Sequence, residues 1–177
     1  MAEYKIIITG PMGAGKTTAI EAVSEVPVVS TDVANTAKKD HAKATTTVAM
    51  DYGELTLGGG DHLRLYGTPG QQRFEFMWKI LAKGALGLIV LMDNARPNAV
   101  RDLDIYLDNF AELIADTGVV IGITRMDVSS QPSLEDYHRS LRRRGVVYPI
   151  MALDVRKKQE VVILLDTLFS ILEAAEA

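Results

Sequence analysis

Cysteine is absent from the 177-residue sequence. Its absence excludes disulfides, zinc sites built on thiolates, cysteine nucleophiles and lipids attached to cysteine. Histidine is scarce too, since His41, His62 and His138 are the only ones and stand far apart. They do not have the spacing of metal ligands, so we expect no dedicated histidine metal site.

Long hydrophobic runs are also missing. The longest, from Leu86 to Met92, is far shorter than the ~20 residues that a helix needs to span a bilayer. The first ten residues, MAEYKIIITG, lack the basic start and the long apolar core of a secretory signal. We therefore expect a cytoplasmic protein with no integral membrane segment.

Neither sign of charge dominates the chain, which has 19 Lys and Arg residues against 23 Asp and Glu residues. This mildly acidic balance argues against a broad surface for nucleic acid, so we expect no nucleic acid partner. Hydrophobic residues make up 47% of the sequence. That content and length suffice for one domain with a real core but not for two, so residues 1–177 are expected to form a single domain.

Short apolar runs alternate with segments of helical periodicity. The runs predict strands at residues 4–9, 48–57, 63–65, 86–92, 119–123 and 146–151. The periodic segments predict helices at residues 17–26, 100–114, from 133 onward and 161–172. Residues 27–46 are polar and predict a loop, and a bulge at Gly53 would explain a change of phase before the turn at 58–61. This order predicts an α/β fold with a mostly parallel six-stranded sheet, one antiparallel edge strand and helices on both faces.

A glycine-rich segment follows the first predicted strand and matches the pattern G-x-x-x-x-G-K-[ST]. Its glycines let backbone N–H groups approach phosphate oxygens, and the helix that follows directs its positive end at the same anion. The lysine adds a full charge, and the first threonine is a hard oxygen ligand suited to Mg²⁺. The pattern predicts that a nucleoside triphosphate is bound by Gly10, Pro11, Met12, Gly13, Ala14, Gly15, Lys16, Thr17 and Thr18.

A second motif, from Gly67 to Phe74, reads GTPGQQRF. It resembles the Asp-x-x-Gly-Gln segment of Ras-like and Arf-like GTPases, which are P-loop NTPases. The resemblance implies that Gly70 senses the γ-phosphate and that Gln71 orients the attacking water. Phe74, Phe76, Met77 and Trp78 crowd the short helix that follows, and one helix face cannot bury all of them. The exposed ones are either ordinary packing residues or part of a partner surface.

The segment TRMD, from Thr124 to Asp127, resembles the Asn-Lys-x-Asp motif by which these GTPases recognise their base. A carboxylate at Asp127 can accept both N1–H and N2–H of guanine, and Arg125 is expected along the face of the base. Thr124 replaces the family's asparagine, which weakens its role in bracing the loop. Ala152, followed by Leu153, falls where the family's Ser-Ala-Lys loop contacts the guanine carbonyl.

The segment TTTVAMD, from Thr45 to Asp51, resembles the first switch of the same family. The resemblance implies that Thr47, or Thr46 as second choice, caps both Mg²⁺ and the γ-phosphate. We therefore expect Mg²⁺ as cofactor on Thr17 and Thr47, and Lys16, Thr47 and Gln71 as the catalytic residues. Gly67 stands where most of the family has a magnesium-binding Asp, so Mg²⁺ is expected to be held loosely with GDP unless another carboxylate, Asp51 first, replaces it.

The closest likeness is to bacterial Ras-like GTPases of the gliding-motility and conservon type, which share the segments at 45–51 and 67–78. It implies a switch that binds GTP and GDP, hydrolyses GTP slowly and acts in bacterial signalling or cell polarity. The expected partner is a roadblock-type regulatory protein or a GTPase activator.

Two other functions remain open from the residues. The segment GPMGAGKTT also resembles small-metabolite kinases such as shikimate kinase, in which Asp32 would be the base, ATP the donor and Arg142 to Arg144 a phosphate lid. That arginine run is otherwise a solvated helix end. The altered base and switch motifs also permit a nucleotide-binding scaffold that does not hydrolyse its ligand.

Overall fold

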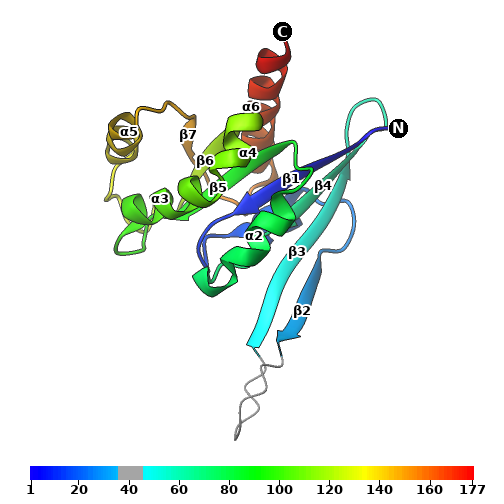
Figure 1. Ribbon diagram of the computed structural model, residues 1–177, viewed down its shortest axis with the longest axis horizontal. Coiled ribbons are helices and arrows are strands. Elements are labelled where there is room, and N and C mark those ends of the chain that lie inside the picture. Colours follow the sequence, from blue (N-terminus) through cyan, green and yellow to red (C-terminus); the bar gives the residue numbers. More distant parts are fainter. Residues whose placement is uncertain (36–45) are drawn as a thin grey trace, which may run out of the picture.

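The computed structural model describes residues 1–35 and 46–177, and gives no side-chain description for residues 31–35 and 46–49. A mixed sheet runs through the centre of this part of the chain, in the order β2-β3-β4-β1-β5-β6-β7 (Figure 1). Its strands are β1 (Glu3–Thr9), β2 (Val29–Asn35), β3 (Thr46–Thr56), β4 (His62–Gly67), β5 (Gly87–Asp93), β6 (Val119–Thr124) and β7 (Ile150–Ala152).

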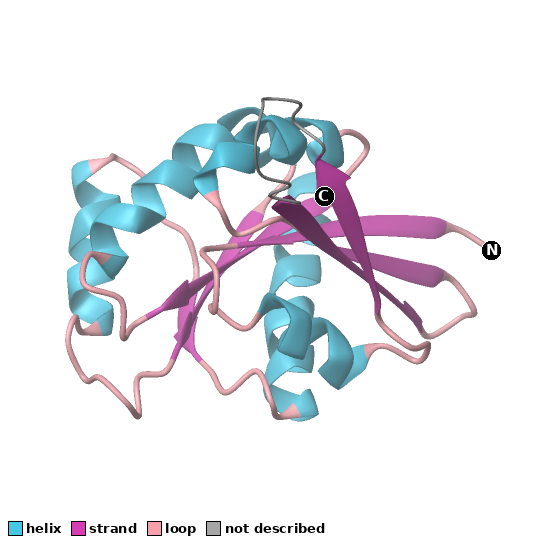
Figure 2. Ribbon diagram, turned by 90° about the horizontal axis from the view of Figure 1, so that it is seen from below, coloured by secondary structure: helices cyan, strands magenta, loops and turns pink. Residues whose placement is uncertain are grey.

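Helices cover both faces of the sheet (Figure 2). They are α1 (Lys16–Val23), the 3₁₀ turn η1 (Gln72–Phe74), α2 (Glu75–Ala82), α3 (Ala99–Asn109), α4 (Ala111–Asp116), α5 (Leu134–Arg143) and α6 (Lys158–Glu176). The helices α1 and α6 pack on one face, and α2, α3, α4 and α5 on the other. Among these described helices, none combines the length and the apolar character that crossing a membrane requires.

The central strands are buried on both sides, as their continuous apolar sequences predict. In β1, Ile6 and Ile8 join the core under α1 and α6, whereas Ile7 joins the core under the other helices. All seven residues of β5 are buried. The expected α/β architecture, with helices on both faces of a mostly parallel sheet, is therefore confirmed.

The prediction of six strands is wrong, because the described part of the sheet has a seventh strand, β2, at its edge. Part of the expected loop, Val29–Asn35, pairs antiparallel with β3, and β3 also runs antiparallel to β4. The loop prediction weighed the polar composition of this segment and overlooked its β-branched residues, which favour a strand. The long strand β3 has a second backbone edge, and β2 satisfies it. Residues 36–45 of the expected loop lie outside the described residues.

The bulge expected at Gly53 is absent from this described hairpin. The pairing of β3 with β4 is continuous from Asp51 opposite Gly67 to Thr56 opposite His62. Gly53 instead allows α1 to pack closely, because a Cβ there would lie 2.4 Å from Cγ2 of Ile20.

Two element boundaries also differ from the predictions. The helix expected over 100–114 is interrupted at Phe110, a buried residue with non-helical backbone angles that stacks on Trp78. The strand expected from Val146 begins only at Ile150, because the Val146 N–H is bonded to the Leu141 carbonyl at the end of α5. The start of α5 follows expectation, since Ser133 forms a capping box there.

Candidate functional site

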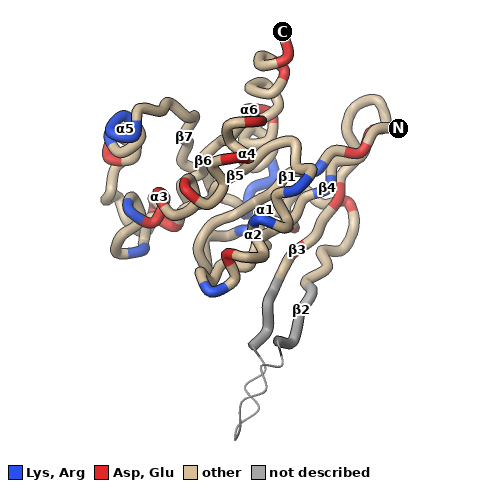
Figure 3. Tube along the Cα trace, in the orientation of Figure 1, with Lys and Arg blue, Asp and Glu red and all other residues tan. Residues whose placement is uncertain are grey.

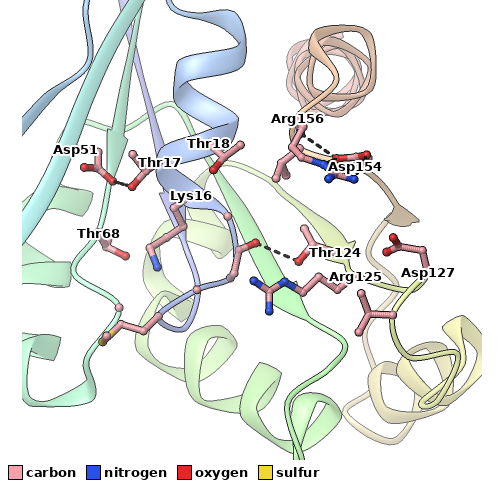
Figure 4. Close-up of a pocket in the computed structure, with 17 residues that line it drawn as sticks. Lys16, Thr17, Thr18, Asp51, Thr68, Thr124, Arg125, Asp127, Asp154 and Arg156 are labelled. Atoms are coloured by element: carbon pink, nitrogen blue, oxygen red, sulfur yellow. Dashed lines mark hydrogen bonds and ion pairs between the residues drawn. The ribbon is translucent and has the colours of Figure 1, made fainter.

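A cavity of about 540 Å³ opens where the parallel strands end, the usual place for ligands in open α/β sheets (Figure 4). The turns after β1, β4, β6 and β7 form most of its wall, and β3 adds one residue because it runs in the opposite direction. The lining residues are Met12, Gly13, Ala14, Gly15, Lys16, Thr17, Thr18, Asp51, Thr68, Gly70, Thr124, Arg125, Asp127, Val128, Asp154, Val155 and Arg156.

The phosphate loop forms one end of this cavity. Helix α1 begins after Gly15 without a side-chain cap, so its first N–H groups are available to an anion. Gly15 has a φ of 98°, and a Cβ there would lie 2.7 Å from Cγ2 of Val155. The glycine therefore permits both the turn into the helix and the close approach of the loop after β7.

Lys16 is folded back onto the loop that carries it. Its Nζ donates hydrogen bonds to the carbonyls of Gly10, at 2.7 Å, and Pro11, at 2.9 Å. The pKa of the ammonium is lowered to about 8, mainly because the group is buried. The nearby Asp51 carboxylate opposes this shift, and Arg96 adds to it. An incoming phosphate would supply the compensating charge that this buried cation lacks.

A carboxylate lies beside the threonine of the phosphate loop. The buried Asp51 accepts a hydrogen bond from the Thr17 hydroxyl and another, at 2.6 Å, from the Ser30 hydroxyl. Asp51 pairs directly with Gly67 across the sheet, and a Cβ on Gly67 would lie 3.2 Å from the Asp51 Cβ. The carboxylate thus comes from the neighbouring strand, next to the position where the resembling GTPases have theirs.

The segment after β4 forms another part of the cavity wall, beside the phosphate loop. The Thr68 N–H donates to the Ile8 carbonyl at 2.9 Å, and its buried hydroxyl lies 2.7 Å from the Thr9 hydroxyl. These contacts attach the segment to β1 and bring Gly70 to the cavity. Gln71, which is partly buried, follows Gly70 but does not line the cavity itself.

The end of β6 borders the other end of the cavity. The buried Thr124 hydroxyl lies 3.0 Å from the Ala14 carbonyl and 3.2 Å from the Met92 carbonyl. The first contact joins the phosphate loop to β6, so Thr124 retains a bracing contact that we expected the loss of asparagine to weaken. Asp127 and Arg125 both extend toward the cavity (Figure 4).

Ala152 and Leu153 do not line the cavity, although both were expected to contact the ligand. Leu153 is 7% exposed and belongs to the core. The residues that follow, Asp154, Val155 and Arg156, take the place at the cavity instead. The resemblance to the Ser-Ala-Lys loop did not predict these three residues, because it matched Ala152 by residue type alone. The end of β7 sets which residues of the loop reach the cavity.

Asp154 and Arg156 form an ion pair with two hydrogen bonds of 2.8 Å (Figure 4). These hydrogen bonds lower the pKa of the Asp154 carboxyl to about 2. The Arg156 guanidinium also lies within electrostatic range of Asp127. The base end of the cavity therefore combines carboxylates and guanidinium groups.

Several predicted residues cannot be placed in the site. The side chains of Thr47, Thr46 and Asp32 lie outside the described residues, although their backbones belong to β3 and β2, and Thr45 is not described at all. Gly10 and Pro11 belong to the phosphate loop but lie behind Lys16 rather than at the cavity.

The donors around Thr17 can hold Mg²⁺ only together with a ligand. Among the described side chains, no group of three or more His, Asp or Glu residues is arranged to bind a metal. Mg²⁺ commonly takes one or two protein oxygens and completes its coordination with phosphate oxygens and water. Thr17 and Asp51 fit that requirement.

The arginine run at the end of α5 lies away from the cavity. Arg142 pairs with Glu135 of the same helix, and Arg144 pairs with Asp104 and Asp108 of α3. Figure 3 shows residues of both charges along α5, and the ion pairs show that Arg142 and Arg144 already have acidic partners. The geometry supports a solvated helix end rather than a phosphate lid.

Comparison with known proteins agrees with a nucleotide site. A family described as "Conserved hypothetical ATP binding protein" matches residues 27–173, well over half of the chain. The match begins after the phosphate loop, so it is independent of the glycine-rich motif.

Two curated relatives are similar over part of their length. An uncharacterized protein of Methanocaldococcus jannaschii is 33% identical over 103 residues, which cover 58% of this chain and 59% of that protein. Intraflagellar transport protein 22 of Chlamydomonas reinhardtii is 30% identical over 115 residues, which cover 63% of this chain and 56% of that protein. The chain thus spans less than two thirds of either relative.

The phosphate loop, its cavity and the family match lead to the same conclusion by separate routes. The chain is a nucleotide-binding P-loop protein, and it belongs to the family described as conserved hypothetical ATP-binding proteins.

Proposed function

We propose that this protein is a guanine-nucleotide switch that binds GTP and GDP with Mg²⁺ and hydrolyses GTP slowly. The observation that carries the proposal is the meeting, in one cavity, of the phosphate loop, Gly70 and Asp127. These groups match, in order, the needs of the β-phosphate, the γ-phosphate and a guanine base.

The proposed binding of Mg²⁺ depends on Thr17 and Asp51. In the GTP state, Thr17 would bind Mg²⁺ directly and Asp51 would orient Thr17 or a bound water, as carboxylates near a metal commonly do. Because Asp51 supplies the charge that Gly67 lacks, we now expect Mg²⁺ to be retained in the GDP state as well. Thr47 remains the proposed threonine of the first switch.

The choice of guanine rests on Asp127. A carboxylate accepts hydrogen bonds only, and guanine presents two adjacent N–H donors where adenine presents none in that arrangement. Arg125 would lie along the face of the base, where its pairing with Asp93 at 3.4 Å holds its position.

An ATP-dependent phosphotransferase is the second candidate, because the description of the matching family names ATP. Two observations weigh against it. The antiparallel strand β3 departs from the all-parallel sheet of small-metabolite kinases, and the arginines of α5 lie away from the cavity. A preference for ATP over GTP, with transfer to a small metabolite, would favour this candidate.

Hydrolysis tests the proposal. The protein with Mg²⁺ should hydrolyse GTP at a rate on the order of 10⁻⁴–10⁻² s⁻¹ and leave ATP nearly intact. Gln71→Leu should lower that rate roughly tenfold or more and change the affinity for GTP little, because a water-positioning residue acts in the transition state.

Gln72→Leu is the matched control, since Gln72 is an exposed neighbour of the same type. It should hydrolyse GTP at the wild-type rate. Tight GTP binding without turnover under any condition would indicate a nucleotide-binding scaffold, and equal losses in both variants would remove Gln71 from its proposed role.

The cellular role is also a proposal. The likeness to gliding-motility and conservon-type GTPases suggests signalling or cell polarity, with a roadblock-type protein or a GTPase activator as partner. Phe76 and Ile80 of α2 are 54% and 57% exposed. They follow the segment Gly67–Phe74, which contains the proposed γ-phosphate sensor and is called the γ-phosphate segment below. They are the proposed contact residues for such a partner.

A further inference from the structure

Trp78, the only tryptophan of the chain, touches the γ-phosphate segment from the side of the core. Its side chain is fully buried, and its Nε1–H donates a hydrogen bond of 2.8 Å to the carbonyl of Pro69. Pro69 immediately precedes Gly70, the residue that we propose as the γ-phosphate sensor. The tryptophan thus holds the peptide group on which sensing depends.

The carbonyl of Pro69 and the N–H of Gly70 belong to the same peptide group. That group is planar, and the only cis bond among the described residues is Gln131–Pro132, so it is trans. In a trans peptide the C=O and the N–H point in opposite directions. Binding the carbonyl toward Trp78 therefore turns the Gly70 N–H away from Trp78.

Gly70 also packs directly on the phosphate loop. A Cβ there would lie 2.6 Å from the Met12 nitrogen and 3.0 Å from Nζ of Lys16. In the described part of the chain, the Gly70 N–H has no hydrogen-bond acceptor. The Gly70 N–H is therefore a free donor beside the Lys16 ammonium, which would face the γ-phosphate. The direction of this N–H decides whether it can donate to that phosphate.

The indole cannot easily turn, because two aromatic rings in and just after α3 hold it. Trp78 stacks on Tyr106, with ring centres 5.0 Å apart, and on Phe110, with ring centres 5.9 Å apart. The proline ring fixes φ of Pro69, so rotation about its ψ is one of the few ways to turn the peptide. The hydrogen bond from the stacked indole restrains that rotation.

We propose that Trp78 is a positioning residue: its hydrogen bond to the Pro69 carbonyl sets the direction of the Gly70 N–H and thereby the preference for a nucleotide with a γ-phosphate. The inference rests on the proposed guanine-nucleotide switch. It also connects the γ-phosphate to α3, because a movement of the Pro69–Gly70 peptide would disturb an indole that stacks on Tyr106 of α3 and on Phe110 at the end of that helix.

The test compares two affinities in one variant. Trp78→Phe keeps an aromatic ring for stacking and removes the N–H. The dissociation constant of a non-hydrolysable GTP analogue should rise roughly tenfold, the order expected when a buried acceptor loses its donor, while that of GDP stays within about twofold. Displacement of a fluorescent guanine nucleotide measures both constants.

Phe110→Leu is the control, because it loosens the same aromatic stack and leaves the indole N–H in place. It should lower the melting temperature and change the ratio of the two affinities much less than Trp78→Phe does. A wild-type ratio in Trp78→Phe, or an equal change of ratio in Phe110→Leu, would overturn the inference and leave Trp78 as a core residue.

If Trp78→Phe does not fold, the same comparison of affinities can be made with 3-benzothienylalanine in place of Trp78. Because the chain has a single tryptophan, this analogue can replace it throughout, and it exchanges the N–H for sulfur at nearly unchanged shape. The same selective loss of GTP-analogue affinity supports the inference, and an unchanged ratio overturns it. A wild-type protein that binds neither nucleotide would instead refute the proposed function, so the two failures are distinguishable.

Discussion

At the scale of single residues, the carboxylate beside Thr17 comes from β3 and not from the end of β4. The resembling GTPases have Asp at the position of Gly67, whereas here Asp51 lies opposite that glycine and beside Thr17. The negative charge beside Thr17 is therefore supplied by the strand that pairs with β4. Gly67 is also sterically suited to this arrangement, since a side chain there would press against Asp51 and Ile20.

Asp51→Asn tests the role of this carboxylate. The affinity of the GDP complex for Mg²⁺ should fall roughly 10- to 100-fold, the usual effect of losing a group that orients a metal ligand. In the wild type, EDTA should speed the release of GDP manyfold, and in the variant it should have little further effect. GDP release measured over a series of free Mg²⁺ concentrations gives both results.

Glu54→Gln is the matched control, since it neutralises another carboxylate of the same strand. Its magnesium dependence should remain that of the wild type. If EDTA leaves wild-type GDP release unchanged, Asp51 does not serve the metal, and the loose binding expected from Gly67 alone is the better account.

At the scale of elements, the site depends on how closely α1 lies against β3. Gly53 makes this packing possible, because its missing side chain leaves room for Ile20 and Ser24 of the helix segment. The same helix carries Lys16 and Thr17 at its start. Packing at one end of α1 thus fixes the position of the phosphate-binding groups at the other.

Gly53→Ala should destabilise the protein by about 1–3 kcal/mol, because the added methyl would lie 2.4 Å from Cγ2 of Ile20. Chemical denaturation measures the change in the free energy of unfolding. Gly58→Ala is the control, since no atom lies within 4 Å of the corresponding position. A loss of stability as large in Gly58→Ala would show that the effect belongs to glycine in general and not to the contact with α1.

At the scale of the whole molecule, the cavity joins segments that are far apart in the sequence. The loops after β1, β4, β6 and β7 meet at one edge of a single sheet and line one cavity, so a nucleotide bound there would contact all four loops. A ligand that binds only the folded state stabilises it by about 2.7 kcal/mol at a hundred times its dissociation constant. The melting temperature therefore reports which nucleotide fits.

GDP at that excess should raise the melting temperature by roughly 5–10 °C for a domain of this size, whereas ADP should raise it little. Asp127→Asn should reduce the effect of GDP, because the carboxylate that accepts both guanine donors is lost. Asp166→Asn, at an exposed position of α6, should keep it. Equal effects of GDP and ADP on the wild type would move the assignment to the ATP-dependent candidate.

Much of the fold could be predicted, because the signals are local. Alternating apolar runs and helical periods located the central strands, the capping box at Ser133 and the last helix. The edge strand β2 was missed, since an edge strand is stabilised by one neighbour and needs no strong apolar pattern of its own. The strand at β7 was overextended because the end of α5 uses the backbone of Val146.

The sequence by itself determined the phosphate loop, because spacing within eight residues sets the turn, the helix start and the charge of Lys16. It also placed Asp127 and Gly70 at the ends of strands. Only the tertiary structure decided that Asp51 lies beside Thr17, that the loop after β7 presents Asp154 and Arg156, and that Trp78 binds Pro69. Such contacts depend on strand register and helix packing, which minimise the free energy of the whole domain rather than of any single segment.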